Sequence, residues 1–294
     1  MHALMLHNGK IHPVSDLSLS AGQVGLLSGW GVFSTIRVYD GVMFHWDRHY
    51  ARMKQDAAVL RVPFPQDPDA LEADLNRLIS ANGPADGSTL PNATLRVVVV
   101  RNNGGLYEGP GPMPDFDVIA FTTEVHGWPD SVRLGVVPNA RFSASEFRGV
   151  KELSWAHNLT WYERARQQGF DEVILLNEHG EVAECTSANI FVVKGKEVWT
   201  PPLESGCLPG VTRSVLLEDI EIEGLSILER KMTSDDLRTA DEICITSTTR
   251  ELISASYIEG VDLEGNRGTC ERVVLALKSY IRDYIDSKKR PVRI

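Results

Sequence analysis

A lysine and a glutamate in the middle of this sequence are residue types that can do chemistry together. Lys151 stands just before a predicted helix, in which apolar residues recur at intervals of three and which Gly169 ends. An apolar run at 173–176, a polar turn and a second extended segment follow, and Glu184 lies within that second segment. Because a compact helix and hairpin join the two residues, their side chains can point into one cleft.

A lysine paired with a carboxylate suits catalysis with pyridoxal 5'-phosphate (PLP). The lysine amine can hold this cofactor as a Schiff base and later carry protons. A carboxylate beside the pyridine nitrogen keeps that nitrogen protonated, so that the ring can accept electrons. Each residue taken alone is more often a solvent-exposed charge, so residue types and spacing do not decide between these interpretations.

The stretch around these two residues resembles the class IV aminotransferases, which are the fold-type IV PLP enzymes. Their pattern is a lysine, an asparagine seven places later, a GFDE-like turn and then E-x-T-S-A-N-I-F. This sequence has Lys151, Asn158, Gly169-Phe170-Asp171-Glu172 and Glu184-Cys185-Thr186-Ser187-Ala188-Asn189-Ile190-Phe191. The family includes branched-chain aminotransferases, D-amino-acid aminotransferases and 4-amino-4-deoxychorismate lyases. The resemblance implies that Lys151 is the catalytic residue and that Glu184 binds the cofactor ring.

Composition limits the classes of partner. The chain has 294 residues, of which 43% are hydrophobic and 24% charged, a balance typical of soluble globular proteins. A formal net charge of −10 argues against a nucleic-acid or anionic-membrane surface. No signal peptide or long apolar run is visible, and the four cysteines form no C-x-x-C pair. We therefore expect a cytoplasmic protein with reduced thiols.

The resemblance also implies the fold class. It predicts an α+β, fold-type IV enzyme with a smaller N-terminal α/β domain and a larger, β-barrel-like C-terminal domain that binds PLP. Gly127 and Pro129 interrupt the chain after an apolar strand, so the best linker is 124–130. We therefore place the N-terminal domain at 1–123 and the C-terminal domain at 131–294. The resemblance further implies a homodimer.

The resemblance assigns the cofactor phosphate to four residues. The family pattern H-x-x-R-L, whose arginine binds phosphate, maps onto His45 and Arg48, with His49 in place of the leucine, and we interpret the nearby Arg52 as a decoy. An arginine suits phosphate because its planar fork donates two hydrogen bonds. The pattern L-P-G-I-T-R matches the segment that contains Val211 and Thr212. A hydroxyl-rich S-T-T strand end supplies Thr248, with its neighbour Thr249 near the substrate.

The histidines at 45 and 49 are four residues apart, which raises the question of a metal. The H-E-x-x-H glutamate is absent, and no third ligand is evident. We predict no metal site and interpret the two histidines as a partly buried helical pair.

The substrate pocket departs from the family pattern. The glycine-rich segment before Arg37 resembles Y-G-D-G-V-F-E-T-I-R and includes Phe33, but Trp30 replaces the aspartate and Ser34 the glutamate. These two positions line the substrate pocket in the family, so they bear on specificity. Trp155 stands where many relatives place a tyrosine beside the cofactor ring.

Two arginines are candidates for the substrate carboxylate. Arg101 matches the strand end of the lyases and D-amino-acid enzymes, whereas Arg96 matches the arginine of the branched-chain enzymes' Y-I-R, with Thr94 in place of the tyrosine. Either arginine could instead cap the sheet or pair with an acid.

These features predict a PLP-dependent transaminase that moves an amino group from a branched-chain-like amino acid to a 2-oxo acid such as 2-oxoglutarate. The nearest alternative is a 4-amino-4-deoxychorismate lyase, which eliminates pyruvate. A D-amino-acid or amine transaminase and a non-catalytic PLP-binding protein also stay open.

Overall fold

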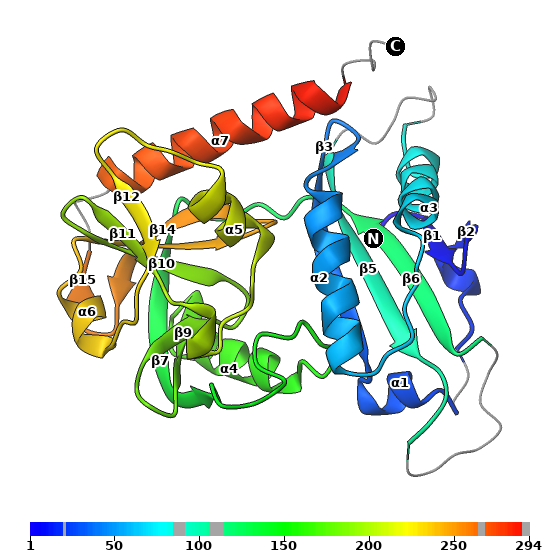
Figure 1. Ribbon diagram of the computed structural model, residues 1–294, viewed down its shortest axis with the longest axis horizontal. Helices are drawn as coiled ribbons and strands as arrows, with labels where there is room; N and C mark the ends of the chain where they lie inside the picture. The colour runs from blue at the N-terminus through cyan, green and yellow to red at the C-terminus, as the bar shows by residue number, and fades with distance from the viewer. Residues whose placement is uncertain (20–21, 85–91, 106–113, 264–267, 290–294) are drawn as a thin grey trace. The chain divides into compact units, whose positions relative to one another are not determined.

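A computed structural model of the chain describes residues 1–19, 22–84, 92–105, 114–263 and 268–289. The chain divides into two compact units, whose elements are labelled in Figure 1. Unit 1 comprises Met1–His126, Val150–Trp155 and the chain from Tyr284 onward, and unit 2 comprises Gly127–Gly149 and Ala156–Asp283.

This division differs from the predicted domains at two places. The chain passes from one unit to the other after His126, inside the predicted linker at 124–130. Residues 150–155, which include Lys151, nevertheless group with unit 1 and not with the predicted C-terminal domain. The C-terminal end also groups with unit 1, where Lys289 pairs with Asp40 at 3.0 Å. A linear boundary cannot capture segments that return to an earlier unit.

Unit 1 contains a six-stranded sheet in the order β2-β1-β6-β5-β3-β4, and every neighbouring pair is antiparallel. The strands are β1 (Leu4–His7), β2 (Lys10–Pro13), β3 (Gly31–Tyr39), β4 (Val42–Met43), β5 (Asn92–Arg101) and β6 (Phe116–Thr123). The helices are α1 (Val24–Ser28), α2 (Trp46–Val59) and α3 (Pro68–Ala81), with a 3-10 turn at Val14–Asp16. The valine- and isoleucine-rich β3 and β5 suit a pleated, half-buried sheet.

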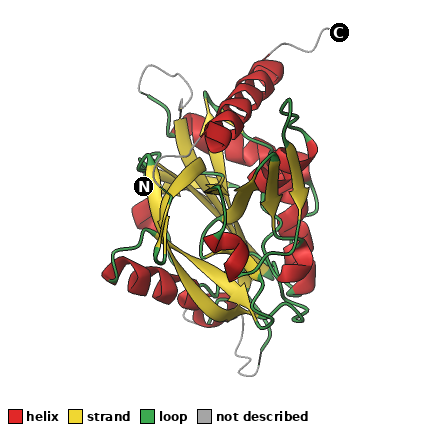
Figure 2. Cartoon of the chain, turned by 90° about the vertical axis from the view of Figure 1, so that its left-hand side faces the viewer, coloured by secondary structure: helices red, strands yellow, loops and turns green. Residues whose placement is uncertain are grey.

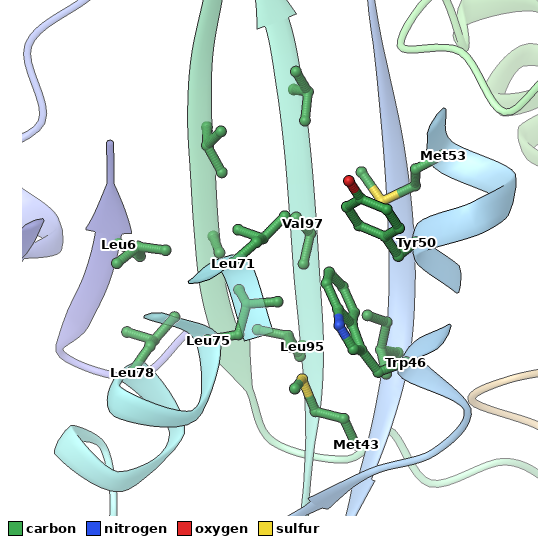
Figure 3. Close-up of a cluster of buried hydrophobic side chains, with 14 of the residues drawn as sticks. Leu6, Met43, Trp46, Tyr50, Met53, Leu71, Leu75, Leu78, Leu95 and Val97 are labelled. Carbon is green, nitrogen blue, oxygen red and sulfur yellow. The ribbon is translucent and has the colours of Figure 1, made fainter. Parts of the chain in front are cut away.

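The helices α2 and α3 cover one face of this sheet. Alternate residues of β3 and β5 point toward them, because successive strand side chains leave opposite faces. Figure 3 shows the resulting core, in which helical side chains pack on those of the strands. The core includes Trp46, Tyr50, Met53, Leu71, Leu75, Leu78, Leu95 and Val97. The opposite face carries Phe33, Thr35 and Arg96, which the helices leave uncovered.

Unit 2 is built on a nine-stranded mixed sheet, which curls strongly in Figure 2. Its order is β12-β11-β10-β13-β14-β7-β8-β9, and β15 pairs with β14. The strands are β7 (Ser131–Arg141), β8 (Glu172–Asn177), β9 (Val182–Cys185), β10 (Asn189–Lys194), β11 (Glu197–Thr200), β12 (Ser226–Glu229), β13 (Glu242–Ser247), β14 (Glu251–Ile258) and β15 (Val261–Asp262). The helices are α4 (Ala156–Gln167), α5 (Val211–Glu218), α6 (Ser234–Arg238) and most of α7 (Gly268–Lys289), whose residues from Tyr284 onward belong to unit 1, with a 3-10 turn at Leu203–Ser205.

The predicted helix after Lys151 and the strand that follows are confirmed as α4 and β8. The extended segment that carries Glu184 is not continuous, however. The chain turns after β9, where the Cys185 N–H donates to the Ala188 carbonyl at 2.8 Å, and β10 then pairs with β11 and β13 instead. Glu184 therefore lies on a short strand that pairs with β8.

All four cysteines are buried, unpaired thiols. Among the described helices, none is long and apolar enough to cross a membrane.

Candidate active site

The backbone of Lys151 is fixed by two elements of unit 1. Its carbonyl accepts the N–H of Phe33 at 3.1 Å, and its own N–H donates to Asp56 Oδ2 on α2 at 3.3 Å. The next residue, Glu152, bridges Val32 in antiparallel fashion. Lys151 therefore lies beside the start of β3 in space, although it is far from β3 in the sequence.

Two aromatic rings lie beside the Lys151 amine. Its Nζ is 4.7 Å from the centroid of Phe33 and 5.7 Å from that of Trp155. The two rings are 5.8 Å apart and nearly perpendicular, at 86°. A cation gains from the face of an aromatic ring, and the same apolar surfaces can contact an apolar substrate side chain.

The structure separates the two candidate carboxylate-binding arginines. The Arg96 guanidinium lies 3.6 Å from the Phe33 ring centroid and donates to Thr35 Oγ1 at 3.3 Å. Burial lowers the pKa of Arg96 to about 10, so it stays cationic at neutral pH. Arg101 lies instead over the ring of Trp30, at 4.3 Å. Arg96, Phe33 and Lys151 thus come together.

Arg101 is held by backbone carbonyl groups. It donates from Nη1 to Arg61 O at 2.5 Å and from Nε to Asn103 O at 2.6 Å. These contacts support a structural role at the end of β5.

Helix α2 presents a buried polar cluster to the sheet. Arg52 donates to Ser34 Oγ at 2.8 Å, and His49 Nδ1 lies 2.7 Å from the same oxygen. Burial, followed by the charge of Arg52, lowers the pKa of His49 well below its usual value, so its ring is neutral. The Nε2 atom of His49 is buried without a hydrogen-bond partner among the described residues. An unsatisfied nitrogen beside a buried arginine suits a site for an anionic group.

This cluster points to Arg52 as a phosphate candidate, a residue that the sequence interpretation set aside as a decoy in favour of Arg48. Arg52 is buried, whereas Arg48, one turn earlier on α2, is half-buried. The signal was present in the sequence, because His49, Arg52 and Met53 also fit H-x-x-R followed by an apolar residue. The two matches overlap, and only packing against Ser34 distinguishes them.

Asp56 is a further buried group that the sequence analysis did not identify. Its carboxyl group is 5% exposed and lies one turn beyond Arg52 on α2. Burial raises the pKa of Asp56 to about 6, and Arg52, the Lys151 N–H and the Lys151 charge oppose that rise.

Both carboxylate oxygens of Glu184 accept hydrogen bonds from residues of unit 2. Arg141 Nε donates to Oε1 at 2.9 Å, and the Leu208 N–H donates to Oε2 at 3.0 Å. Arg141 also donates to Asn158 Oδ1 at 3.2 Å, and the Asn158 amide donates to Thr186 O at 2.7 Å. Arg141 ends β7, and no motif in the sequence pointed to it.

The Leu208 contact links Glu184 to the start of α5. Asn189 donates to Leu208 O at 2.9 Å, and a Cβ on Gly210 would lie 2.0 Å from Asn189 Oδ1, so only glycine fits there. Gly210 is the N-cap of α5 and offers no side chain to the first turn, where Val211 and Thr212 are buried. Free N–H groups at a helix start suit a phosphate.

The two predicted threonines follow the end of β13, on which α5 packs. Thr248 and Thr249 are half-buried, and the Thr249 carbonyl accepts the Trp128 indole N–H at 3.1 Å. Thr248 therefore lies in the turn between β13 and β14, next to the strand end at which the resemblance places it.

A buried charge pair fixes the turn between β9 and β10. Glu172 is fully buried, and its Oε2 accepts from Arg250 at 3.2 Å and from Ser187 Oγ at 2.5 Å. Thr186 donates to the other oxygen, and Arg250 lies over the Trp128 ring at 4.0 Å. No local motif predicts this pair, because its two members are 78 positions apart along the chain. It holds the turn that follows Glu184.

Each unit, taken by itself, contains residues of the kinds that the resemblance assigns to PLP. In unit 1 these are Lys151 and, one turn of α2 beyond the predicted Arg48, the buried Arg52 with His49 beside it. In unit 2 they are Glu184, whose carboxylate accepts two hydrogen bonds, and the start of α5. A cationic arginine, a carboxylate and helix N–H groups are the kinds of group that a phosphorylated pyridine needs. Within the described residues, no group of three or more histidine, cysteine, aspartate or glutamate side chains could hold a metal ion.

Comparisons with known proteins agree with the resemblance. A family model described as amino-transferase class IV matches residues 31–258. A putative branched-chain-amino-acid aminotransferase of Methanocaldococcus jannaschii is 32% identical over 256 residues, 86% of this chain and 87% of that protein. D-alanine aminotransferase of Bacillus licheniformis is 30% identical, with 87% and 88% covered. Aminodeoxychorismate lyase of Bacillus subtilis is also 30% identical, with 96% of both chains covered.

The fold is similar to that of solved structures. A hypothetical aminotransferase from Mycobacterium tuberculosis in its PLP-bound form superposes with a TM-score of 0.81 at 21% identity, covering 96% of this chain and 100% of that chain. The predicted family and fold-type IV architecture are confirmed.

The buried carboxyl group of Asp56 predicts a pH-dependent stability. Its folded-state pKa lies above its unfolded value of 3.8, so the folded protein holds the proton more tightly and loses stability as pH rises from about 4 to about 6. This shift corresponds to about 3 kcal/mol at most. In Asp56→Asn, we expect that loss to be absent. Urea unfolding of the cofactor-free protein at several pH values measures it. A difference between variant and wild type that stays constant from pH 4 to pH 7 would contradict the prediction.

Proposed function

Because the chain belongs to the class IV aminotransferase family, we propose that it transfers an amino group from an apolar, branched-chain-like amino acid to a 2-oxo acid such as 2-oxoglutarate. Enzymes of this family use PLP, and the chain is a PLP-dependent transaminase. The observation that supports the proposed donor most directly is the placement of the Lys151 amine against the Phe33 and Trp155 rings.

We propose cofactor-binding roles for the residues that the resemblance singles out. When bound, PLP supplies a ring that withdraws electrons from the substrate carbon. Lys151 holds the cofactor through its amine and later moves a proton from the substrate carbon. Glu184, oriented by Arg141 and the Leu208 N–H, places its carboxylate at the pyridine nitrogen. The phosphate contacts are assigned to Arg52, in preference to Arg48, and to Val211, Thr212 and Thr248.

The proposed substrate contacts lie on the face of the unit 1 sheet that α2 and α3 do not cover. Arg96 stays cationic and pairs with the substrate carboxylate, while Phe33 and Trp155 contact its apolar side chain. Thr249 is a further substrate contact in unit 2, and Arg101 is the alternative for the carboxylate.

Elimination of pyruvate is the second candidate activity. The aminodeoxychorismate lyase of Bacillus subtilis is similar to this chain over 96% of both lengths. A D-amino-acid donor is a third, supported by the similarity to D-alanine aminotransferase. Both use the same cofactor, so substrates must separate them.

A donor panel tests the proposed activity. The PLP-loaded protein is incubated with 2-oxoglutarate and either L-leucine, L-valine, L-isoleucine, D-alanine or an aryl amine, and glutamate is measured. We expect glutamate from the L-branched donors above all others, since their side chains suit the two rings. In parallel, 4-amino-4-deoxychorismate is supplied and pyruvate is measured. Pyruvate release without glutamate formation would replace the proposal with the lyase, and preference for D-alanine would reverse the proposed stereochemistry.

The two arginines of α2 give a matched test of the phosphate contact. We expect Arg52→Met to weaken PLP binding by roughly 10- to 100-fold, the range for losing hydrogen bonds from a charged group. Arg48→Met, on the same helix, should change PLP binding by about twofold or less, because a half-buried charge at the protein surface contributes little. Equilibrium dialysis of PLP with the cofactor-free variants measures both. The opposite order would restore Arg48 to the site.

A homodimer stays our prediction. Large apolar side chains are exposed in both units, including Leu27 at 72%, Phe142 at 63% and Phe147 at 48%, and a second copy could cover them. Light scattering should give twice the chain mass of 32.6 kDa, whereas the single-chain mass would contradict it. The four buried thiols support a cytoplasmic location, which cell fractionation can check.

A further inference from the structure

Asp56 is a buried acid next to the lysine that the proposed mechanism does not use. It is 5% exposed, and its Oδ2 accepts the backbone N–H of Lys151 at 3.3 Å. Its position on α2, one turn beyond Arg52, places it beneath the segment that runs along the start of β3. The contact joins the helix to the residue that carries the reactive amine.

A charge at this position is not required for the hydrogen bond. An asparagine has nearly the same shape and would accept the same N–H through its carbonyl oxygen. The carboxylate, by contrast, is disfavoured by burial, which is why its proton is held up to about pH 6. A buried aspartate at this position therefore lowers the stability of the folded protein relative to an asparagine, which would accept the same hydrogen bond. The presence of the aspartate indicates a role for its negative charge.

Three charged or titratable groups act on Asp56 or lie close to it. On its own helix, Arg52 is the nearest cation and is already bound to Ser34, and His49 is neutral because it is buried. From the segment 150–155, Lys151 contributes both its N–H and its amine charge. The Lys151 amine is therefore the group on which a change in the Asp56 charge has consequences for chemistry.

The effect between the two groups is reciprocal. The positive charge of Lys151 favours the ionised form of Asp56. By linkage, the ionised carboxylate favours the protonated amine by the same free energy.

We propose that Asp56 is a positioning residue for Lys151, whose carboxylate anchors the lysine backbone to α2 and whose negative charge strengthens the hold of the amine on its proton. The inference rests on the proposed function, in which this amine binds PLP and carries a proton. Proton transfer is efficient when the pKa of the group that carries the proton lies near the working pH. Asp56 thus adjusts the amine to its task without touching substrate or cofactor.

The test uses cofactor uptake by the PLP-free protein. Only the neutral amine attacks the PLP aldehyde, so the uptake rate, followed by stopped-flow absorbance, reports the amine's protonation as pH is varied. In Asp56→Asn, we expect the midpoint of this profile to fall by about one pH unit, the usual lower range for losing an opposite charge. Below the midpoint, uptake becomes about tenfold faster. A midpoint that coincides with the wild-type value would overturn the proposal.

Two further variants separate charge from structure. Asp56→Ala removes the acceptor as well, so we expect the same midpoint shift together with a lower melting temperature. Asp117→Asn is the matched control, because Asp117 is also a buried aspartate of unit 1, bound by Asn8 at 2.6 Å and Gln23 at 2.7 Å. It should leave the midpoint unchanged. An equal shift in Asp117→Asn would assign the effect to general loosening and overturn the proposal.

The wild-type protein provides a readout that does not depend on a folded variant. In protein labelled with 13C at the lysine Cε, the Lys151 signal should show an inflection near pH 6, where Asp56 titrates. A single transition without that inflection would contradict the proposal. Borohydride reduction and peptide mapping locate the cofactor-bearing lysine independently. A label on another lysine defeats the proposed function, whereas a label on Lys151 with an unchanged Asp56→Asn midpoint defeats this inference alone.

Discussion

The hydrogen bonds between residues 151–153 and the start of β3 determine the chemistry available to unit 1. Phe33 donates to the Lys151 carbonyl, and Leu153 donates to the Gly31 carbonyl at 3.0 Å. This short addition beside the sheet places a lysine among side chains that belong to a distant part of the sequence. Without it, the lysine would be one solvent-exposed charge on a connecting segment. The aromatic neighbours, the contact with α2 and the proximity of Arg96 all depend on this pairing.

In unit 2, the surrounding residues hold the carboxylate of Glu184 in a defined orientation. Glu184 lies on a strand of four residues, and short strands are weakly restrained by their own pairing. The restraint comes from groups around it: Arg141 on one oxygen, the Leu208 N–H on the other, and the Glu172–Arg250 pair behind the next turn. Because Leu208 lies two residues before Gly210, the N-cap of α5, the contact that orients the carboxylate also restrains the segment that leads into the helix N-terminus. One loop therefore holds both the carboxylate of Glu184 and the start of α5.

Much of this architecture could be predicted from the sequence, because the signals for these elements are local and strong. The helix before Gly169, the strand after it and the motif around Glu184 are read from spacing and turn residues that lie within a few positions of each other. Predictions became ambiguous where the deciding contact is long-range. Arg48 and Arg52 both fit H-x-x-R, and only the packing of α2 against Ser34 favours Arg52. Arg96 and Arg101 lie five residues apart on one strand, so the pleat directs them to opposite faces, and no local pattern states which face meets the lysine. Asp56 gave no signal, since its environment is made by a segment far along the chain.

The alternation along β3 has a consequence for how this enzyme can change over evolutionary time. Phe33 and Thr35 lie on the face of the sheet that carries Arg96, beside Lys151, whereas Val32, Ser34 and Ile36 lie on the face that α2 and α3 cover. The register with β5 keeps these two sets apart. Inserting or deleting one residue would exchange the two sets, placing a ring among helical contacts and aliphatic groups beside the amine. New donor preferences should therefore arise by replacing side chains at every second position, while the length of this strand stays fixed across descendants that remain functional.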